Sequence, residues 1–395
     1  MTSVSTPAAK PFIGIFNDSF PPILDGVTLT VENYVKWLTR MGLNPCVVTP
    51  WNPSRVDRGY EVMRYFSLPI RSRHPYRYGY PKIDPFIWRK LRATPFRLVH
   101  SHCPFSSGRL AIYVKKKQNV PLIGTFHSKY KQDLQHSFRH APWCIPIIMR
   151  RILSFFNACD EVWIPQASVE DTVREYGYKG PLTVVDNGID YADIPQHSLH
   201  KIKSDARRSL GIEDDELSLL FVGQHIWEKG LRVIADTLRL IDGKVKFRMN
   251  FVGTGYAAAE LQRLLERYGL AQRTRLWGVV PDRDRLQDFY AAADLFLFPS
   301  LYDNAPLVVR ESAALGAPAI IPEGSTASEV IIDGENGFLT RRSAEDYAAL
   351  ICQLDGNRAR IHRAGIGARK TLVRSWQDVV EEVADRYRVI LSRYE

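Results

Sequence analysis

Short apolar, β-branched runs alternate with longer helical patterns along almost the whole chain. Unbroken apolar strands between helices are typical of parallel sheets that are covered on both faces. The candidate strands of the first half are Phe12–Phe16, Cys46–Thr49, Leu98–His100, Leu122–Thr125, Glu161–Ile164 and Leu182–Val185. Those of the second half are Ser218–Val222, Phe247–Val252, Arg275–Trp277, Leu295–Phe298 and Ala319–Ile321. Two such sets predict an α/β protein with two doubly wound domains.

The length agrees with this division, because 395 residues exceed one ordinary core and suit two domains of roughly 150–200 residues each. The strand pattern stops near 190–216, where polar, charge-dense sequence indicates a linker and a short helix. We therefore expect a first domain over 1–192 and a second over 193–375. Apolar residues at helical spacing in 376–395 predict a final helix that packs back toward the first domain.

The cysteines and the N-terminal residues indicate the cellular compartment of the protein. The five cysteines, which are scattered and include no CxxC pair, argue against a disulfide framework or a zinc ribbon. The first residues suit a buried strand better than a signal peptide, and no apolar run approaches the roughly 20 residues of a membrane-spanning helix. We expect a cytoplasmic protein that can associate peripherally with the inner face of the cytoplasmic membrane.

The net charge of +10 is concentrated in one half of the chain. Residues 1–190 carry +11 and the remainder −1, and 55–151 holds 20 basic against 4 acidic residues. This distribution argues against a uniformly basic coat for nucleic acid, and no nucleic-acid-binding module is recognisable, so we expect no nucleic acid as a partner.

Three clusters carry much of this charge: a basic and aromatic segment over 71–80, Lys115–Lys117, and Lys129–Lys131. Such clusters can dock on anionic lipid at about 1 kcal/mol per basic residue. A solvated basic face, or a groove for an anionic soluble glycan, explains them equally. We therefore expect an anionic membrane surface as one candidate partner of 55–151.

Glycine follows several candidate strands. After the first strand, a corner ends at Gly26 and leads into a helix that we expect to begin near Thr28. Glycine lets a backbone approach a ligand, and a helix N-terminus favours an anion, although a tight turn alone explains this corner as well. In the second half, Gly223 to Gly230 includes Gln224 and Lys229, and another corner holds Gly253 and Gly255.

The segment from Phe298 to Glu311 carries the strongest signal. Asp303 follows a strand, and Pro306 suits the first turn of a helix that Leu307 and Val308 continue. Glu311 lies in the apolar run VVRESAALGAPAII, and a carboxylate in such a helix usually has a specific partner. Two acids could therefore face different parts of one extended ligand whose phosphates meet the first helical amides.

Together these segments resemble a retaining glycosyltransferase of family 4 with the GT-B fold, in which two Rossmann-like domains face each other across a cleft. The resemblance spans nearly the whole chain. It is carried by the corner ending at Gly26, Thr125–Ser128, Asn187–Asp190, Gly223–Gly230, Gly253–Gly255, Asp303 with Glu311, and Asp333–Phe338. Within the family, the chain is similar to diacylglycerol glucosyltransferases.

The resemblance implies three catalytic residues. Asp303 would orient the hydroxyls of the transferred sugar, His127 would lie beside that sugar, and Lys229 would neutralise the departing diphosphate. Glu311 would bind the nucleotide ribose. The donor-binding residues implied are Gly26, Gly223, Gln224, Lys229, Gly253, Gly255, Asn304, Leu307, Val308 and Glu311.

Two positions depart from the family pattern. Gln224 stands where the family usually has Arg, which removes an always-charged, bidentate contact to the diphosphate. Arg310, Ser325 and Thr326 are candidates to compensate. Asp303 stands where the family usually has Glu, so its reach toward the sugar is shorter.

The resemblance implies transfer of a hexose, with UDP-glucose as the expected donor and no metal or other cofactor. The expected acceptor is a hydroxyl, either on a membrane lipid such as diacylglycerol or on a soluble or lipid-linked polysaccharide. One other class stays open, a catalytically inactive GT-B protein that binds an anionic partner, and a second class, a nicotinamide enzyme, is discounted. The latter needs an acid about 20 residues after Gly255, where the strand Arg275–Trp277 is basic instead.

Overall fold

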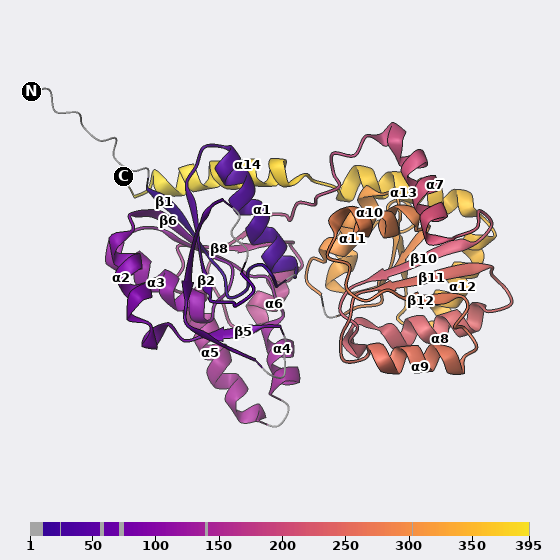
Figure 1. Cartoon of the computed structure of the whole chain (residues 1–395), viewed down its shortest axis with the longest axis horizontal. Helices are drawn as coiled ribbons and strands as arrows, with labels where there is room; N and C mark the ends of the chain where they lie inside the picture. Colours follow the sequence, from indigo (N-terminus) through magenta and orange to yellow (C-terminus); the bar gives the residue numbers. More distant parts are fainter. Residues whose placement is uncertain are drawn as a thin grey trace, which may run out of the picture. The chain divides into compact units, whose positions relative to one another are not determined.

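The computed structural model describes residues 11–23, 25–55, 59–70, 75–138, 141–301 and 303–394. The chain divides into two compact units (Figure 1). Unit 1 contains residues 1–187 and 376–395, and unit 2 contains residues 188–375. Unit 1 therefore ends a few residues before the boundary that we expected at 192, and the C-terminal segment is part of it.

Unit 1 is built on a seven-stranded sheet in which every pair of neighbouring strands is parallel. Its strands are β1 (Phe12–Phe16), β2 (Pro45–Pro50), β3 (Glu61–Tyr65), β6 (Phe96–Ser101), β7 (Leu122–Thr125), β8 (Glu161–Ile164) and β9 (Leu182–Val184). The order is β3-β2-β1-β6-β7-β8-β9, so the chain reverses direction across the sheet between β1 and β6. A separate antiparallel ribbon pairs β4 (Ser67–Pro69) with β5 (Arg77–Gly79).

Helices cover this sheet and bury its apolar side chains in a core that includes Phe16, Val48, Val99 and Phe155. The helices of unit 1 are α1 (Gly26–Arg40), η2 (Pro81–Ile83), α2 (Pro85–Ala93), α3 (Ser106–Gln118), α4 (Tyr130–Ser137), η3 (Pro142–Cys144), α5 (Ile145–Phe156), α6 (Val169–Glu175) and α14 (Trp376–Leu391). Helix α1 begins at Gly26 rather than near Thr28, because the Asp25 side chain caps it by accepting from the Thr28 amide at 2.7 Å.

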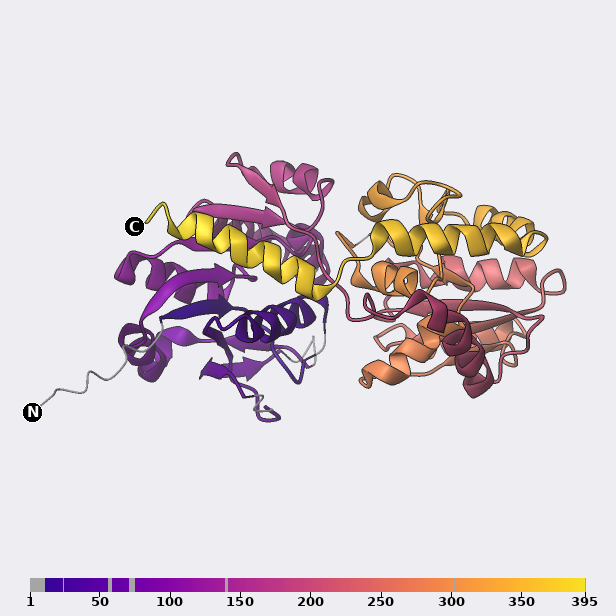
Figure 2. The same ribbon diagram turned by 90° about the horizontal axis from the view of Figure 1, so that it is seen from above.

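The C-terminal helix α14 lies beside α1, although the two are separated by most of the sequence (Figures 1 and 2). Its apolar stripe is buried, including Val379, Val383 and Tyr387. The ring of Trp376 packs edge-on against Tyr34 of α1 at 6.3 Å between centroids. Helix α14 therefore completes the covering layer of the unit 1 sheet.

Unit 2 has a six-stranded sheet, again with only parallel neighbours. Its strands are β10 (Leu217–Val222), β11 (Phe247–Val252), β12 (Thr274–Leu276), β13 (Leu295–Leu297), β14 (Ala319–Pro322) and β15 (Phe338–Thr340). The order β12-β11-β10-β13-β14-β15 reverses between β10 and β13, as in a Rossmann fold. Its helices are η4 (Gln196–Ser198), α7 (Leu199–Leu210), η5 (Trp227–Lys229), α8 (Leu231–Ile241), α9 (Ala258–Arg267), α10 (Arg283–Ala292), α11 (Leu307–Ala314), η6 (Thr326–Val330), α12 (Ala344–Asp355) and α13 (Arg358–Leu372).

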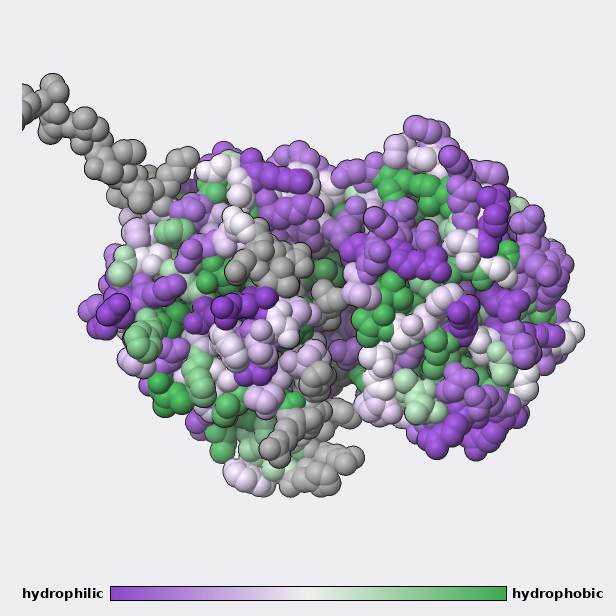
Figure 3. Space-filling view, in the orientation of Figure 1, coloured by the Kyte–Doolittle hydropathy of each residue, from purple (hydrophilic) through white to green (hydrophobic). Residues whose placement is uncertain are grey.

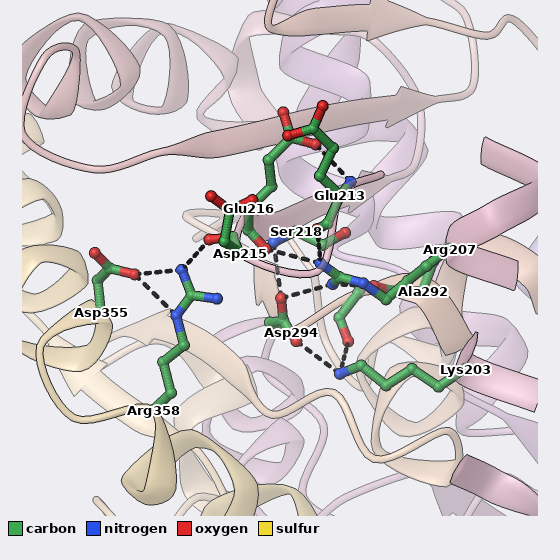
Figure 4. Close-up of polar contacts among 11 residues, drawn as sticks. Lys203, Arg207, Glu213, Asp215, Glu216, Ser218, Ala292, Asp294, Asp355 and Arg358 are labelled. Carbon is green, nitrogen blue, oxygen red and sulfur yellow. Dashed lines mark hydrogen bonds and ion pairs between the residues drawn. The ribbon is translucent and has the colours of Figure 1, made fainter. Parts of the chain in front are cut away.

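A buried ionic cluster fixes α7 to the sheet of unit 2 (Figure 4). Asp294 accepts from Lys203 at 2.7 Å, from Arg207 at 3.0 Å and from the Ser218 amide at 2.8 Å. Burial acts to raise the pKa of Asp294, but its bonds to Lys203, Ser218 and Arg207 hold that pKa below its usual value. The helix after the linker is therefore tied to the starts of β10 and β13 by charge as well as by packing.

The expected doubly wound α/β architecture is confirmed, since each candidate strand overlaps an observed one. Strands β3, β4, β5 and β15 were not expected. All five cysteines lie within the described residues and are free thiols. Among the described residues, no helix combines the length and the apolar character needed to cross a membrane.

Candidate functional site

The loops at the carboxyl ends of the unit 2 strands bring most of the expected site residues to one edge of its sheet. Ligands of open α/β sheets bind outside these ends, at the point where the strand order reverses. Gly223, Gln224 and Lys229 follow β10, whereas Asp303 and Asn304 follow β13, so they flank that point. Gln224 is exposed, and Asn304 is buried.

The glycine corners of unit 2 have a packing role. A Cβ at Gly253 would collide with the carbonyl oxygen of Gly223, and a Cβ at Gly255 would collide with that of His225. The loops after β10 and β11 therefore pack backbone against backbone, which requires glycine whether or not a ligand binds. The glycines at 253 and 255 are thus explained without a phosphate.

Lys229 and Asp303 form an ion pair, and both side chains are largely buried. Gly230 adopts φ 79°, and a Cβ there would meet the Pro299 carbonyl, so the turn after η5 lies tightly against the loop after β13. Ser300 donates to the second Asp303 oxygen at 2.6 Å. The residues expected to meet the diphosphate and the sugar are therefore bound to each other in this ligand-free structure.

Glu311 lies on α11 and is 4% exposed. Arg283 Nη2 donates to its Oε1 at 2.5 Å, and the Tyr290 hydroxyl donates to its Oε2 at 2.7 Å. The same Arg283 nitrogen lies 3.0 Å from Asp190, which belongs to the linker motif. The apolar context of Glu311 predicted a specific partner. The structure shows two, the guanidinium of Arg283 and the phenol of Tyr290, both on α10.

Sequence reasoning did not single out Arg283 or Tyr290. Arg283 stands in the charge-dense run PDRDRLQD, which reads as an ordinary exposed helix start capped by Asp282. Tyr290 falls on the apolar face of that helix, where an aromatic residue is normally part of the core. Only the packing of α10 beside α11 shows that both side chains reach Glu311.

The first turn of α11 presents backbone amides at the same edge of the sheet. Leu307 and Val308 are half-buried, and among the described residues no side chain caps this turn. Such a helix start attracts an anion. Arg310, however, is buried and donates to the Leu372 carbonyl at 3.2 Å, and Ser325 donates to the Pro322 carbonyl at 2.8 Å. Neither is therefore placed to make up for the charge that Gln224 lacks.

Gly26 and His127 are in unit 1, after β1 and β7. Gly26 is the exposed first residue of α1. His127 is half-buried, its Nε2 lies 2.9 Å from Nδ1 of His102, and burial lowers its pKa to about 4. The imidazole of His127 is therefore neutral near pH 7.

Asp18, which sequence reasoning also missed, holds the corner that leads to Gly26. Its carboxylate accepts from the amides of Ser106 at 3.1 Å and Ser107 at 2.9 Å, and from the Tyr65 hydroxyl at 3.0 Å. It acts as an N-terminal cap for α3 supplied from another part of the chain. The corner is thus anchored structurally through β1, β3 and α3.

The basic clusters of unit 1 are partly neutralised. Lys115 pairs with Asp160 at 2.7 Å and Lys131 with Glu175 at 2.8 Å, whereas Lys116 and Lys117 are exposed. In the basic and aromatic segment, 71–74 lies outside the described residues. Only part of the formal charge of 55–151 is therefore free of an acidic neighbour within the described ranges.

Comparison with known proteins agrees with this architecture. One family model, described as Glycosyltransferase Family 4, matches residues 24–193, and another, Glycosyl transferases group 1, matches 216–357. Alpha-monoglucosyldiacylglycerol synthase of Acholeplasma laidlawii is 24% identical over 350 residues, which cover 86% of this chain and 87% of that protein. The synthase of the same name from Streptococcus pneumoniae is 25% identical over 340 residues, covering 83% of this chain and 74% of that protein.

Solved structures show the same fold. Sucrose-phosphate synthase of Thermosynechococcus elongatus superposes with a TM-score of 0.78 at 19% identity, covering 97% of this chain and all of that one. Anabaena HepE, solved with UDP-glucose, has a TM-score of 0.74 at 16% identity and covers 95% of this chain and all of that one.

The two Rossmann-like sheets and these structural neighbours show that the chain has the GT-B fold. The chain belongs to glycosyltransferase family 4, because the two family models together match most of it. The predicted family, fold and enzyme class are thereby confirmed. The roles of the individual site residues stay predictions.

Proposed function

We propose that this enzyme transfers glucose from UDP-glucose to a hydroxyl of a membrane lipid such as diacylglycerol, with retention of the anomeric configuration. The observation that carries the proposal is the polar set at the reversal point of the unit 2 sheet. It combines a buried acid held by Arg283 and Tyr290, an uncapped helix start, and the Lys229–Asp303 pair. The two similar synthases, whose names specify a monoglucosyldiacylglycerol product, support the choice of sugar and acceptor.

Donor binding would exchange partners within this set. Glu311 presents a fixed carboxylate that can accept from the two ribose hydroxyls, while the amides of Leu307 and Val308 receive the diphosphate. Lys229 then moves from Asp303 to the diphosphate. This exchange releases the Asp303 carboxylate to accept from hydroxyls of the sugar, so the donor replaces an internal ion pair with two contacts of its own.

The reaction follows from where charge develops. The bond between the anomeric carbon and the phosphate oxygen breaks, which leaves an oxocarbenium-like sugar and a diphosphate with more negative charge. Lys229 and the α11 amides stabilise that charge, a type of effect worth about 3 kcal/mol per preorganised donor. The leaving phosphate oxygen accepts the proton of the acceptor hydroxyl, which attacks from the same face. Because these groups already supply positive potential, we propose that no metal is needed.

The acceptor proposal is supported by the surface of unit 1. Large apolar side chains are exposed around the β4–β5 ribbon and α2, and at the ends of α4 and α5: Phe66, Leu68, Tyr78, Tyr80, Ile83, Phe86, Phe138, Trp143 and Ile147. Figure 3 shows hydrophobic residues gathered at the lower end of unit 1, where α4 and α5 lie. Lys82, Arg89, Arg150 and Arg151 are exposed among them. Apolar side chains flanked by cations suit an anionic bilayer at the inner face of the cytoplasmic membrane.

The test measures nucleotide release and lipid glucosylation for UDP-glucose, UDP-galactose, UDP-GlcNAc and GDP-mannose, using liposomes of anionic lipid with and without diacylglycerol. We expect glucosylated lipid only from UDP-glucose and only when diacylglycerol is present. Transfer to a soluble polysaccharide but not to lipid would favour the polysaccharide acceptor. No turnover of any donor would favour an inactive GT-B protein.

Sedimentation with the same liposomes tests the surface. Phe86 and Trp143 are each 74% exposed, and Phe86→Ser with Trp143→Ser should reduce binding at low salt. Tyr256→Ser is the matched control, because Tyr256 is 56% exposed but belongs to unit 2. Equal loss in the control would contradict docking through unit 1.

A further inference from the structure

Three histidines form a stack in unit 1, in which His100 and His102 are buried and His127 is half-buried. His100 lies on β6, His102 follows that strand, and His127 follows the neighbouring β7. The rings of His100 and His102 have centroids 4.2 Å apart, and those of His102 and His127 are 5.2 Å apart, with interplanar angles of 27° and 20°. Burial lowers the pKa of all three, so the stack is neutral near pH 7.

His100 is held at both ring nitrogens. Its Nδ1 lies 2.6 Å from the Tyr387 hydroxyl on α14, and its Nε2 lies 2.6 Å from the Thr125 hydroxyl on β7. The edges of Tyr34 and Trp163 also contact the ring, at 5.9 Å and 4.9 Å between centroids. The ring of His100 is thus held in one orientation, and His102 stacks against it.

His102 is 1% exposed and uses its ring nitrogens unequally. Its Nδ1 lies 2.9 Å from His127 Nε2, whereas its Nε2 has no hydrogen-bond partner among the described residues. In a bond between two neutral imidazoles, one nitrogen donates and the other accepts. The two rings must therefore take the same tautomer, with hydrogen either on both Nδ1 atoms or on both Nε2 atoms.

The unpartnered nitrogen decides between these arrangements. Hydrogen on both Nε2 atoms would leave a buried N–H of His102 without an acceptor, and orphaned buried donors are rarer than under-used acceptors. Hydrogen on both Nδ1 atoms leaves only a bare nitrogen in an aromatic pocket beside Tyr34. The second arrangement makes His102 the donor and His127 Nε2 the acceptor.

We propose that His102 is a positioning residue that fixes His127 as its Nδ1–H tautomer. The inference rests on the proposed glucosyl transfer and on the role that the resemblance to family 4 implies for His127, beside the transferred sugar. A His127 so held can donate from Nδ1 to a hydroxyl oxygen without first reorienting, and His102 acts through His127 rather than on the substrate.

Steady-state kinetics with UDP-glucose and diacylglycerol liposomes test the role. Loss of a partner that orients a functional histidine typically costs about 10- to 100-fold in function, so His102→Leu should lower kcat at least about tenfold with donor KM changed less than about threefold. His102→Asn should restore most of kcat, because an Asn amide can donate from nearly the same place. His362→Leu, at an exposed histidine of α13, is the matched control.

A double-mutant cycle separates this inference from the proposed function. If His127→Ala keeps full kcat, the proposed role of His127 is wrong. If His127→Ala loses kcat but His102→Leu does not, or if the two losses multiply in the double variant, the inference about His102 is wrong.

Nitrogen-15 NMR of the imidazoles in the wild-type protein gives a readout that does not depend on transfer. We expect the His127 signals, assigned by their absence in His127→Ala, to show Nδ1 protonated and Nε2 bare. A wild-type His127 with hydrogen on Nε2 would overturn the proposal.

Discussion

Units 1 and 2 place their strands in the same order around the reversal point but surround it with different chemistry. In unit 2, the acids beside that point are paired with cations: Glu311 with Arg283 and Asp303 with Lys229. In unit 1, the loops after β6 and β7 carry neutral imidazoles, and Asp18, a half-buried acid after β1, is held by amides and hydroxyls. One topology thus supports both an ionic and a neutral site.

The difference agrees with the ligand that each unit is proposed to bind. A nucleotide diphosphate brings its own charge, so unit 2 keeps cations whose present partners can be exchanged for phosphate. A sugar hydroxyl and a lipid hydroxyl are neutral, and buried neutral groups with fixed tautomers can meet them without a large desolvation cost. The comparison predicts that the two units respond differently to charge removal and to acid.

The largest expected effect is that of Glu311→Ala. We expect UDP binding and glucosyl transfer to fall by at least about 100-fold, because the variant lacks the carboxylate that would accept from the two ribose hydroxyls, and each hydrogen bond to a charged group is worth about 1.5–3 kcal/mol. Titration calorimetry with UDP measures the loss directly. Glu345→Ala, at an exposed acid near the start of α12, should bind UDP as the wild type does. Unchanged UDP affinity in Glu311→Ala would refute the ionic description of the unit 2 site.

The next largest expected effect is that of mild acid, which should destabilise unit 1 more than unit 2. The folded pKa values of His100, His102 and His127 lie below the usual value, so the unfolded chain takes up protons first as the pH falls below about 6.5. Stability is therefore lost between about pH 6.5 and 4, and His127 alone contributes about 2 kcal/mol of loss at pH 5. In unit 2, His225 has a pKa lowered to about 4 by burial, so this one group adds a loss similar to that of His127 alone.

Asp294 behaves in the opposite sense. Because its folded pKa is lowered, its contribution is present above the unfolded value of about 3.9 and is lost only as the pH falls through the folded value. Hydrogen exchange at pH 7 and pH 5, corrected for intrinsic rates, should therefore show unit 1 peptides losing protection more than those around α7 and β10. Earlier opening of unit 2 at pH 5 would contradict this.

Most of the fold could be predicted, because parallel strands that are buried on both faces are mostly apolar, as Phe12–Phe16 and Leu295–Leu297 are. Strand β3 was not predicted because it lies at the sheet edge and its polar residues, Glu61 and Arg64, interrupt the apolar pattern, so that only Met63 and Tyr65 are buried. Strand β15 has three residues, too few for a periodic signal.

The site was predictable only in part. Local sequence motifs identify Asp303, Glu311 and Lys229 without knowledge of the fold. The structure brings Lys229 and Asp303, which are 74 positions apart in the sequence, into contact. The partners of Glu311 come from another helix, so their roles depend on the packing of α10 on α11, which no local spacing encodes. Gly253 and Gly255 are the opposite case. Their motif resembles one that binds a ligand, but the packing of the loops already requires both glycines.

The smallest expected effect, and the sharpest test of how unit 2 holds its acid, is that of Tyr290→Phe. Tyr290 is fully buried, and both burial and the charge of Glu311 raise its pKa well above the usual value, so its hydroxyl stays a donor at any working pH. Removing that hydroxyl leaves Arg283 to orient Glu311 by itself, and a hydrogen bond to a charged group is worth about 1.5–3 kcal/mol before relaxation. We expect the Kd for UDP to rise by about three- to tenfold, with no change in this factor between pH 6.5 and 8.5.

Tyr191→Phe is the matched control, since the Tyr191 hydroxyl donates at 2.9 Å to the Arg283 carbonyl rather than to Glu311. An equal rise in Kd for both variants would mean that general packing around α10, and not the bond to Glu311, sets donor affinity.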